Sequence, residues 1–217
     1  MLFRDRTEAG RNLASRLAHY SNAPNLLVLA LPRGGVPVGY EVARALNAPL
    51  DIFLVRKLGV PGHEELAMGA IASGGVRVLN EDVVRTLGVP NDVIAAVTAQ
   101  EQRELERRES AYRGNAPPVK VRGKTVILVD DGLATGSTMR AAVKALRRQG
   151  PARLVVAVPV GAAATCADFQ DETDETICAQ TPEPFYAVGM WYQNFAPTTD
   201  DEVRELLQHT TEDTAQP

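Results

Sequence analysis

The feature of this 217-residue chain that most constrains its fold is an alternation of short apolar runs with helix-length segments. The runs at 26–31 and 125–130 have the length of buried strands, and the segments that follow them, 36–46 and 138–149, have helical character. Strands and helices that alternate in this way are typical of a mostly parallel sheet with helices on both faces. We therefore expect an α/β fold of that kind.

The rest of the chain extends this pattern. Further strands are predicted at 51–55, 154–159, 176–179 and 185–188, and a hairpin at 68–72 and 76–79. Further helices are predicted around Leu13 and Leu17, at 81–87, 91–113 and 162–170, and from about 200, where Thr199 would provide the cap. Because domains average about 150 residues, this length predicts a single domain over 1–217.

The composition excludes several classes of protein. Hydrophobic residues make up 45% and charged residues 23%, which is typical of a globular domain and not of a disordered chain. The 23 basic and 27 acidic side chains give a net charge of −4, so we expect no nucleic-acid partner. No apolar run approaches the ~18 residues of a membrane span. The charged N-terminus does not resemble a signal peptide, so we expect a cytoplasmic protein without a membrane partner.

The two cysteines, Cys166 and Cys178, form neither a C-x-x-C pair nor a framework of several bridges. A disulfide scaffold and a zinc site are therefore not predicted. We expect two thiols in a reducing cytosol.

The strongest chemical signal lies at the end of the run at 125–130. Two adjacent carboxylates, Asp130 and Asp131, stand where a strand of the predicted sheet ends, which is the edge at which such sheets bind ligands. The residues that follow offer backbone N–H groups, hydroxyls and a helix dipole to an anion; they are Ala134, Thr135, Gly136, Ser137 and Thr138. This loop has neither the lysine nor the spacing of a P-loop, and no G-x-G-x-x-G follows any predicted strand.

One kind of ligand suits this combination. The phosphate of a ribose 5-phosphate would lie in the loop, while the carboxylates accept hydrogen bonds from its hydroxyls or hold a hydrated Mg²⁺. The alternative is a plain turn with a capping threonine and two solvated aspartates.

Residues 126–138, VILVDDGLATGST, resemble the 5-phosphoribosyl-1-pyrophosphate (PRPP) signature of the type I phosphoribosyltransferases. Leu31-Pro32-Arg33-Gly34-Gly35 is similar to the loop through which that family holds pyrophosphate by backbone amides. Arg56-Lys57 is similar to the pair that meets pyrophosphate in the adenine and orotate enzymes. Taken alone, the first segment could be a glycine turn with an exposed arginine, and the second could be two solvated cations.

The resemblance to the PRPP-binding core covers roughly 26–160. It implies that family's α/β core with a flap hairpin, whose mobile part would be 58–67. It also implies a small hood that binds the base, built here from the N-terminal helix and about 176–209. The family's habit of dimerising implies a homodimer.

The resemblance also implies a reaction and roles for the site residues. Ribose 5-phosphate would pass from PRPP to a nitrogenous, nucleobase-like acceptor, with Mg²⁺ as cofactor and pyrophosphate as product. The pyrophosphate would be bound by Arg33, Gly34, Gly35, Arg56 and Lys57, and the 5-phosphate by residues 134–138. Asp130 and Asp131 would hold the ribose hydroxyls, balance the cationic sugar and reach the metal through the ligand or water. The catalytic residues would be Asp130, Asp131, Lys57 and Arg33.

The sequence departs from the family at two points. No lysine lies between residues 58 and 67, where the orotate enzymes have a catalytic one, and His63 in this segment is either a participant or a bystander. Ala134 stands where the hypoxanthine-guanine enzymes have an aspartate, so their recognition of 6-oxopurines is not implied. For the base, Trp191 and Tyr192 in the densest aromatic cluster either stack on it or pack under the final helix.

The Leu-Pro-Arg-Gly-Gly segment, an Arg-Lys-Leu-Gly segment and a Trp-Tyr-x-x-Phe near the C-terminus are shared with a bacterial branch of predicted phosphoribosyltransferases. Nearly the whole chain resembles this branch, whose acceptor is unassigned. Two functions therefore stay open. The chain either transfers ribose 5-phosphate to a purine or pyrimidine, or it is a non-catalytic regulatory protein that binds PRPP or a nucleotide.

Overall fold

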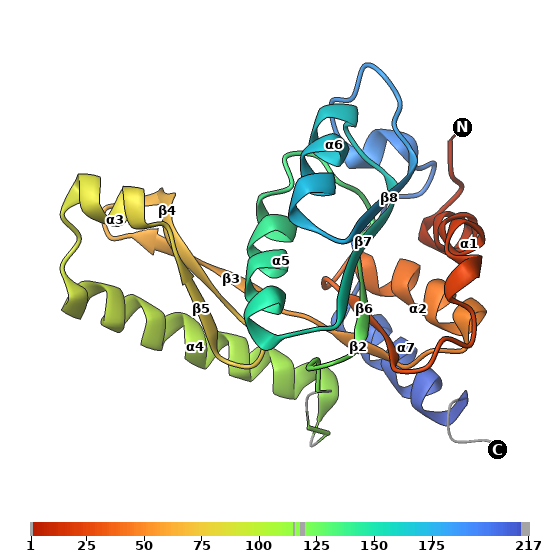
Figure 1. The fold of residues 1–217 in the computed structure, drawn as a ribbon, viewed down its shortest axis with the longest axis horizontal. Coiled ribbons are helices and arrows are strands. Elements are labelled where there is room, and N and C mark those ends of the chain that lie inside the picture. Colours follow the sequence, from red (N-terminus) through yellow and green to blue (C-terminus); the bar gives the residue numbers. More distant parts are fainter. Residues whose placement is uncertain (1, 115, 118–119, 214–217) are drawn as a thin grey trace.

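The computed structural model describes residues 2–114, 116–117 and 120–213, which form two sheets with helices around them (Figure 1). The main sheet has five strands in the order β2-β1-β6-β7-β8, and every pairing in it is parallel. Its strands are β1 (Leu26–Ala30), β2 (Leu50–Ile52), β6 (Thr125–Val129), β7 (Arg153–Val160) and β8 (Glu175–Gln180). The expected parallel α/β fold is confirmed.

Helices cover both faces of this sheet. One face carries α1 (Arg6–Arg16), α2 (Gly35–Leu46) and α7 (Asp200–Asp213), and the other carries α5 (Ser137–Gln149) and α6 (Ala163–Glu172) (Figure 1). Every residue of β1 is buried, because Val28 faces the first helix layer while Leu27 and Leu29 face the second. This double burial is why the strand reads as a continuous apolar run.

The strand order places a topological switch point between β1 and β6. From β1 the chain passes through α2 to β2, whereas from β6 it passes through α5 to β7 on the other side. The connections diverge at the carboxyl ends of these two neighbouring strands, where open α/β sheets bind their ligands. The residues predicted to carry the chemistry at 31–35 and 130–138 follow these two strands directly, whereas Arg56 and Lys57 do not.

The second sheet is antiparallel and forms an arm that extends away from the main sheet (Figure 1). It consists of β3 (Val55–Val60), β4 (His63–Ala72) and β5 (Val76–Leu79), followed by the helices α3 (Glu81–Leu87) and α4 (Asn91–Arg113). The predicted hairpin at 68–79 is confirmed. The predicted strand at 51–55 is wrong as one element, because β2 ends at Ile52 and β3 begins at Val55 in a different sheet.

The segment 58–67, predicted to be the mobile part of a flap hairpin, consists mostly of extended strand. Its two sides belong to β3 and β4, which pair from Val55–Ala72 to Val60–His63 around a tight turn at Gly62. Gly62 has a φ of +79°, a conformation that glycine adopts without steric cost. The glycines and proline of this segment are typical of a loop. The residues on either side of the turn nevertheless pair across β3 and β4 and extend the hairpin.

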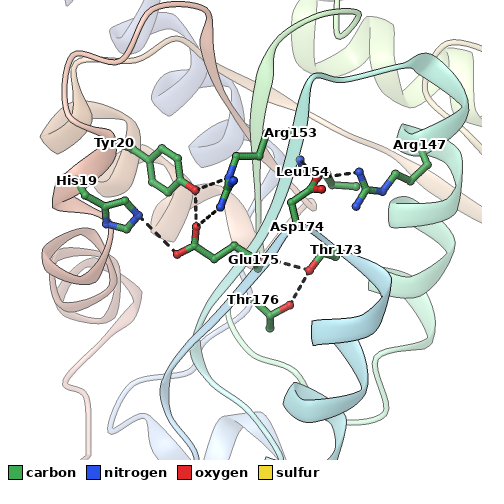
Figure 2. Close-up of polar contacts among 9 residues, drawn as sticks. All are labelled: His19, Tyr20, Arg147, Arg153, Leu154, Thr173, Asp174, Glu175 and Thr176. Carbon is green, nitrogen blue, oxygen red and sulfur yellow. Dashed lines mark hydrogen bonds and ion pairs between the residues drawn. The ribbon is translucent and has the colours of Figure 1, made fainter.

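Polar side chains form a network of contacts at the amino-terminal ends of the strands β7 and β8 (Figure 2). Glu175 accepts hydrogen bonds from Tyr20 and, at 3.0 Å, from Arg153. The neighbouring Asp174 pairs with Arg147 of α5 at 2.8 Å. These contacts tie the starts of β7 and β8 to α5 and to the short helix η1 (Ala18–Tyr20), and they involve none of the predicted site residues.

Two local predictions near the C-terminus have opposite outcomes. Glu202 donates its backbone N–H to the Thr199 hydroxyl at 3.1 Å, which confirms the predicted cap of α7. The predicted strand at 185–188 is wrong, since this segment leads into the short helix η2 (Val188–Trp191). Its apolar side chains pack against the N-terminal segment around Phe3 instead of extending a sheet.

The prediction of two free thiols is also wrong, because Cys166 and Cys178 form a disulfide. Cys166 lies on α6 and Cys178 on the edge strand β8, which follows that helix and packs against it, so their Cα atoms are 6.4 Å apart. That proximity depends on the helix–strand connection and not on a cysteine motif.

Over the residues described, no helix has both the length and the apolar character to cross a membrane.

Candidate functional site

The loops that follow β1 and β6 touch at the carboxyl edge of the main sheet. A Cβ atom on Gly34 would lie only 2.0 Å from Oδ2 of Asp131, and one on Gly35 would lie 3.0 Å from Cα of Asp130. Ordinary van der Waals contacts begin near 3.4 Å, so a side chain at either position would collide with the residues of the acidic pair unless these moved. The Gly34–Gly35 backbone is therefore packed directly against the acidic pair. The peptide bond between Pro32 and Arg33 in the same loop is cis.

The two carboxylates have different environments. The backbone N–H of Asp131 donates to Oδ1 of Asp130 at 2.8 Å, and Oδ2 of Asp131 pairs with Nε of Arg6 at 2.9 Å. Burial raises the pKa of both groups; the charge of Asp131 raises that of Asp130 further, while Arg6 lowers the pKa of both. The pair thus resists ionisation and gains from hydrogen-bond donors or cations nearby.

Tyr192 and Arg6 are site residues whose roles the sequence did not indicate. The hydroxyl of Tyr192 donates to the backbone oxygen of Asp131 at 2.5 Å, and burial raises the pKa of this tyrosine. Arg6 lies at the start of α1, 125 residues before its partner Asp131. A pairing over that distance leaves no local sequence signal.

Side chains of α6 pack against the loop at 134–138. Gly136 caps α5 in a left-handed conformation, and a Cβ there would lie 2.7 Å from the ring of Phe169. The hydroxyl of Thr165 donates to the backbone oxygen of Ala134 at 2.7 Å. Thr135, Ser137 and Thr138 are exposed. The first N–H groups of a helix have no partner within it, so this loop offers amides and hydroxyls to an anion.

The three predicted cations are each paired with a carboxylate of this chain. Arg33 lies 3.6 Å from Asp200, and both side chains are at least half exposed. Lys57 is also half exposed and lies 3.9 Å from the fully exposed Glu65. Exposed ion pairs contribute little to stability because solvent screens them, so a polyanion could replace the carboxylate at either one.

Arg56 differs from the other two cations. Its Nε and Nη2 atoms lie 2.7 and 2.5 Å from one oxygen of Glu101 on α4, and both side chains are largely buried. The structure therefore uses this guanidinium to hold the arm together.

Comparison with known proteins identifies the family. Residues 62–185 match the family model described as the phosphoribosyl transferase domain, which is more than half of the chain. The chain belongs to the phosphoribosyltransferase family. The match includes the acidic pair and the loop at 134–138, and it begins after Arg33 and Lys57.

Two individual proteins are similar to nearly the whole of this chain. The crystal structure of the protein TT1426 from Thermus thermophilus superposes with a TM-score of 0.85 at 40% identity, covering 96% of this chain and 99% of that one. A protein of Mycobacterium tuberculosis H37Rv, Rv0571c, whose name assigns it provisionally as a phosphoribosyl transferase, is 47% identical over 215 residues. That match covers 99% of this chain but 48% of the relative, so the chain spans about half the length of this curated relative.

A more distant relative matches only part of the chain. The bifunctional protein PyrR of Chloroflexus aurantiacus is 39% identical over 136 residues, which is 58% of this chain and 65% of that protein.

The aromatic segment, residues 185–195, lies next to the loop that carries the acidic pair. Val188 packs on Gly132, where a Cβ atom would lie 2.4 Å from its side chain. Tyr192 is only 5% exposed and packs against Phe3, so its ring presents little surface to a base. Trp191 is partly exposed, stacks on Phe185 with ring centres 6.4 Å apart, and has an indole N–H that is buried without a hydrogen-bond partner. The ring that could meet a base is therefore Trp191, and both aromatic residues pack near the N-terminal segment and not under the final helix.

The donor set for a metal is small. In the part of the chain that the structure describes, no group of three or more His, Cys, Asp or Glu side chains is placed to hold a metal ion. Asp130 and Asp131 are the carboxylates at the site. Two carboxylates fit a Mg²⁺ ion that keeps most of its coordination on ligand oxygens and water. His63 lies exposed at the tip of the arm hairpin.

Proposed function

We propose that this chain transfers ribose 5-phosphate from PRPP to a ring nitrogen of a purine or pyrimidine base and releases pyrophosphate. The observation that carries this proposal is the contact of the Gly34–Gly35 loop with Asp130 and Asp131, beside the anion-binding loop at 134–138. The site thus presents amides, then two carboxylates, then amides and hydroxyls. PRPP presents the matching order of pyrophosphate, ribose hydroxyls and 5-phosphate.

In this reaction the main role of the protein would be to stabilise the charges that develop on the pyrophosphate and the ribose. The bond between C1 of the ribose and the pyrophosphate oxygen breaks, a bond from C1 to the acceptor nitrogen forms, and the acceptor's proton leaves to solvent. Negative charge develops on the pyrophosphate, where Arg33, Lys57 and the amides of Gly34 and Gly35 would bind it. Positive charge develops on the ribose, beside the carboxylates that hold its hydroxyls.

The roles of the metal and of Arg56 follow from the same geometry. Asp130 and Asp131 would hold Mg²⁺ through water or through the ligand, and the ion would neutralise part of the pyrophosphate charge. Arg56 would act indirectly, because its ion pair with Glu101 holds the strand that carries Lys57.

The test is pyrophosphate release from PRPP and Mg²⁺ in the presence of each base from a purine and pyrimidine panel. We expect release with one base or a small group of bases, and none from the double variant Asp130→Asn/Asp131→Asn at unchanged circular dichroism. Failure of the unaltered chain to bind PRPP and to release pyrophosphate would contradict the proposal.

A regulatory protein that binds PRPP or a nucleotide without turnover is the second candidate. The partial match to a relative named as a bifunctional protein, together with the absence of a lysine between residues 58 and 67, favours it. If the chain binds PRPP but releases pyrophosphate with none of the bases, the regulatory function is the correct one.

A further inference from the structure

The N-terminal segment is paired with the aromatic segment above the site. The N–H of Phe3 donates to the oxygen of Trp191 at 2.9 Å, and the N–H of Gln193 donates back to the oxygen of Phe3 at 2.8 Å. The N–H of Asn194 donates to the oxygen of Arg4 at 2.8 Å. This short ladder, with the fully buried ring of Phe3, fixes where α1 begins relative to the acidic pair.

Arg6 lies in the first turn of α1, and its guanidinium group makes three contacts there. Its Nε lies 2.9 Å from Oδ2 of Asp131, and its Nη1 donates to the oxygen of Ala196 at 2.8 Å. Its guanidinium carbon lies 4.0 Å from the centre of the Phe195 ring. The side chain is only 11% exposed, so these partners surround it.

The same guanidinium also reaches the loop after β1. The point that a Cβ on Gly34 would occupy is 2.0 Å from Oδ2 of Asp131 and 3.3 Å from Nε of Arg6. Arg6, Gly34 and Asp131 therefore meet at one place, between the segment assigned to pyrophosphate and the carboxylate assigned to ribose.

We propose that Arg6 is a positioning residue of the ribose site, which holds the Asp131 carboxylate in place for a ribose hydroxyl and ties it to the segment at 195–196. This inference rests on the proposed function and extends it to the N-terminal helix. Asp130 and Asp131 are adjacent like charges, so a fixed cation is needed to hold one carboxylate close to the glycine backbone. The planar fork of arginine can pair with the carboxylate and with a backbone oxygen in fixed directions, whereas the ammonium of lysine acts as a point charge.

Ribose-containing and ribose-free ligands separate this role from a merely structural one. PRPP and pyrophosphate, each with Mg²⁺, are titrated calorimetrically into the unaltered chain and into Arg6→Gln. We expect Arg6→Gln to bind PRPP about tenfold to a hundredfold more weakly, the loss typical of a charge-assisted contact. Pyrophosphate affinity is expected to change by less than about threefold.

Arg11→Gln is the matched control. Arg11 lies on the same helix and pairs with the buried Glu41 at 3.0 Å, so this variant also loses an ion pair. Its PRPP affinity is expected to equal that of the unaltered chain. Arg6→Lys keeps the charge without the fork, and its PRPP affinity is expected to lie between those of the unaltered chain and Arg6→Gln.

The outcomes distinguish this inference from the proposed function. Unchanged PRPP binding by Arg6→Gln, or equal losses for PRPP and pyrophosphate, would overturn the positioning role alone. Absence of PRPP binding by the unaltered chain would overturn the proposed function, and this inference with it. If Arg6→Gln does not fold, Phe195→Leu replaces it, since it removes the ring under the guanidinium at an accessible position. We expect that variant to lose about threefold to tenfold in PRPP affinity with unchanged pyrophosphate affinity, and unchanged PRPP affinity would overturn the inference.

Discussion

Replacing Gly34 by alanine tests the contact between the two loops directly. The backbone of Gly34 has φ −61° and ψ −32°, which suits alanine, so conformation alone would not oppose the change. The obstacle is Asp131, whose Oδ2 would lie 2.0 Å from the new methyl group. The carboxylate would have to retreat by roughly 1.4 Å to reach ordinary contact, which breaks its 2.9 Å ion pair with Arg6.

The expected cost follows from these contacts. Loss of a partly buried, charge-assisted hydrogen bond costs about 1.5–3 kcal/mol. Replacing glycine by alanine at a compatible backbone position returns about 0.4–1 kcal/mol through the unfolded state. Gly34→Ala should therefore lower the free energy of unfolding by about 1–2 kcal/mol.

A double-mutant cycle separates this collision from any other effect of the methyl group. With Asp131→Ala already in place the obstacle is absent, and Gly34→Ala should become neutral or stabilise by up to about 1 kcal/mol. Urea unfolding of the four proteins gives the coupling, which we expect to be about 2 kcal/mol. Additive effects within about 0.5 kcal/mol would show that Gly34 and Asp131 do not touch and would refute the site geometry.

Further predictions concern pH, the cations, the aromatic segment and the disulfide. Burial raises the pKa of Asp130, so unfolding of the unaltered chain becomes easier as pH rises from the ordinary aspartate pKa through the raised one. Asp130→Asn lacks this penalty, so urea unfolding should show that its stability advantage over the unaltered chain grows as pH rises; an advantage that shrinks would contradict the sign. Lys57→Ala should weaken PRPP and pyrophosphate far more than nucleoside monophosphates in calorimetric titrations, and equal losses would remove Lys57 from the pyrophosphate site. Trp191→Leu should reduce affinity for the acceptor base or nucleotide while sparing PRPP, whereas loss of folding would assign the ring to packing. Reduction of the Cys166–Cys178 disulfide, whose cysteines are 12 residues apart, should lower the free energy of unfolding by up to about 3 kcal/mol. The Cys166→Ser/Cys178→Ser variant should not respond to reductant.

The parts of the fold that sequence predicted well are those governed by local pattern. The strands β1 and β6 are buried on both faces, so their apolar runs have no competing interpretation. The acidic pair and the glycine loops follow those strands directly. Strand order then brings Gly34 next to Asp131 without any further signal.

The parts that sequence did not predict depend on contacts between distant segments. Arg6 meets Asp131 only because the N-terminal segment pairs with residues 191–194. The disulfide depends on the packing of α6 against β8. The segment 185–188 has strand-like composition, yet Val188 packs onto Gly132 and not into a sheet. In each case tertiary packing decided the outcome and the local sequence was ambiguous.

The central claim is that the Gly34–Gly35 loop and the loop at 134–138 are two halves of one PRPP site. Calorimetric titration of the unaltered chain with PRPP and Mg²⁺, repeated in excess pyrophosphate and in excess ribose 5-phosphate, tests it most directly. We predict one binding event per chain that each competitor abolishes on its own, because each occupies one half of the site. No PRPP binding, or binding that only one of the two competitors displaces, would contradict the claim.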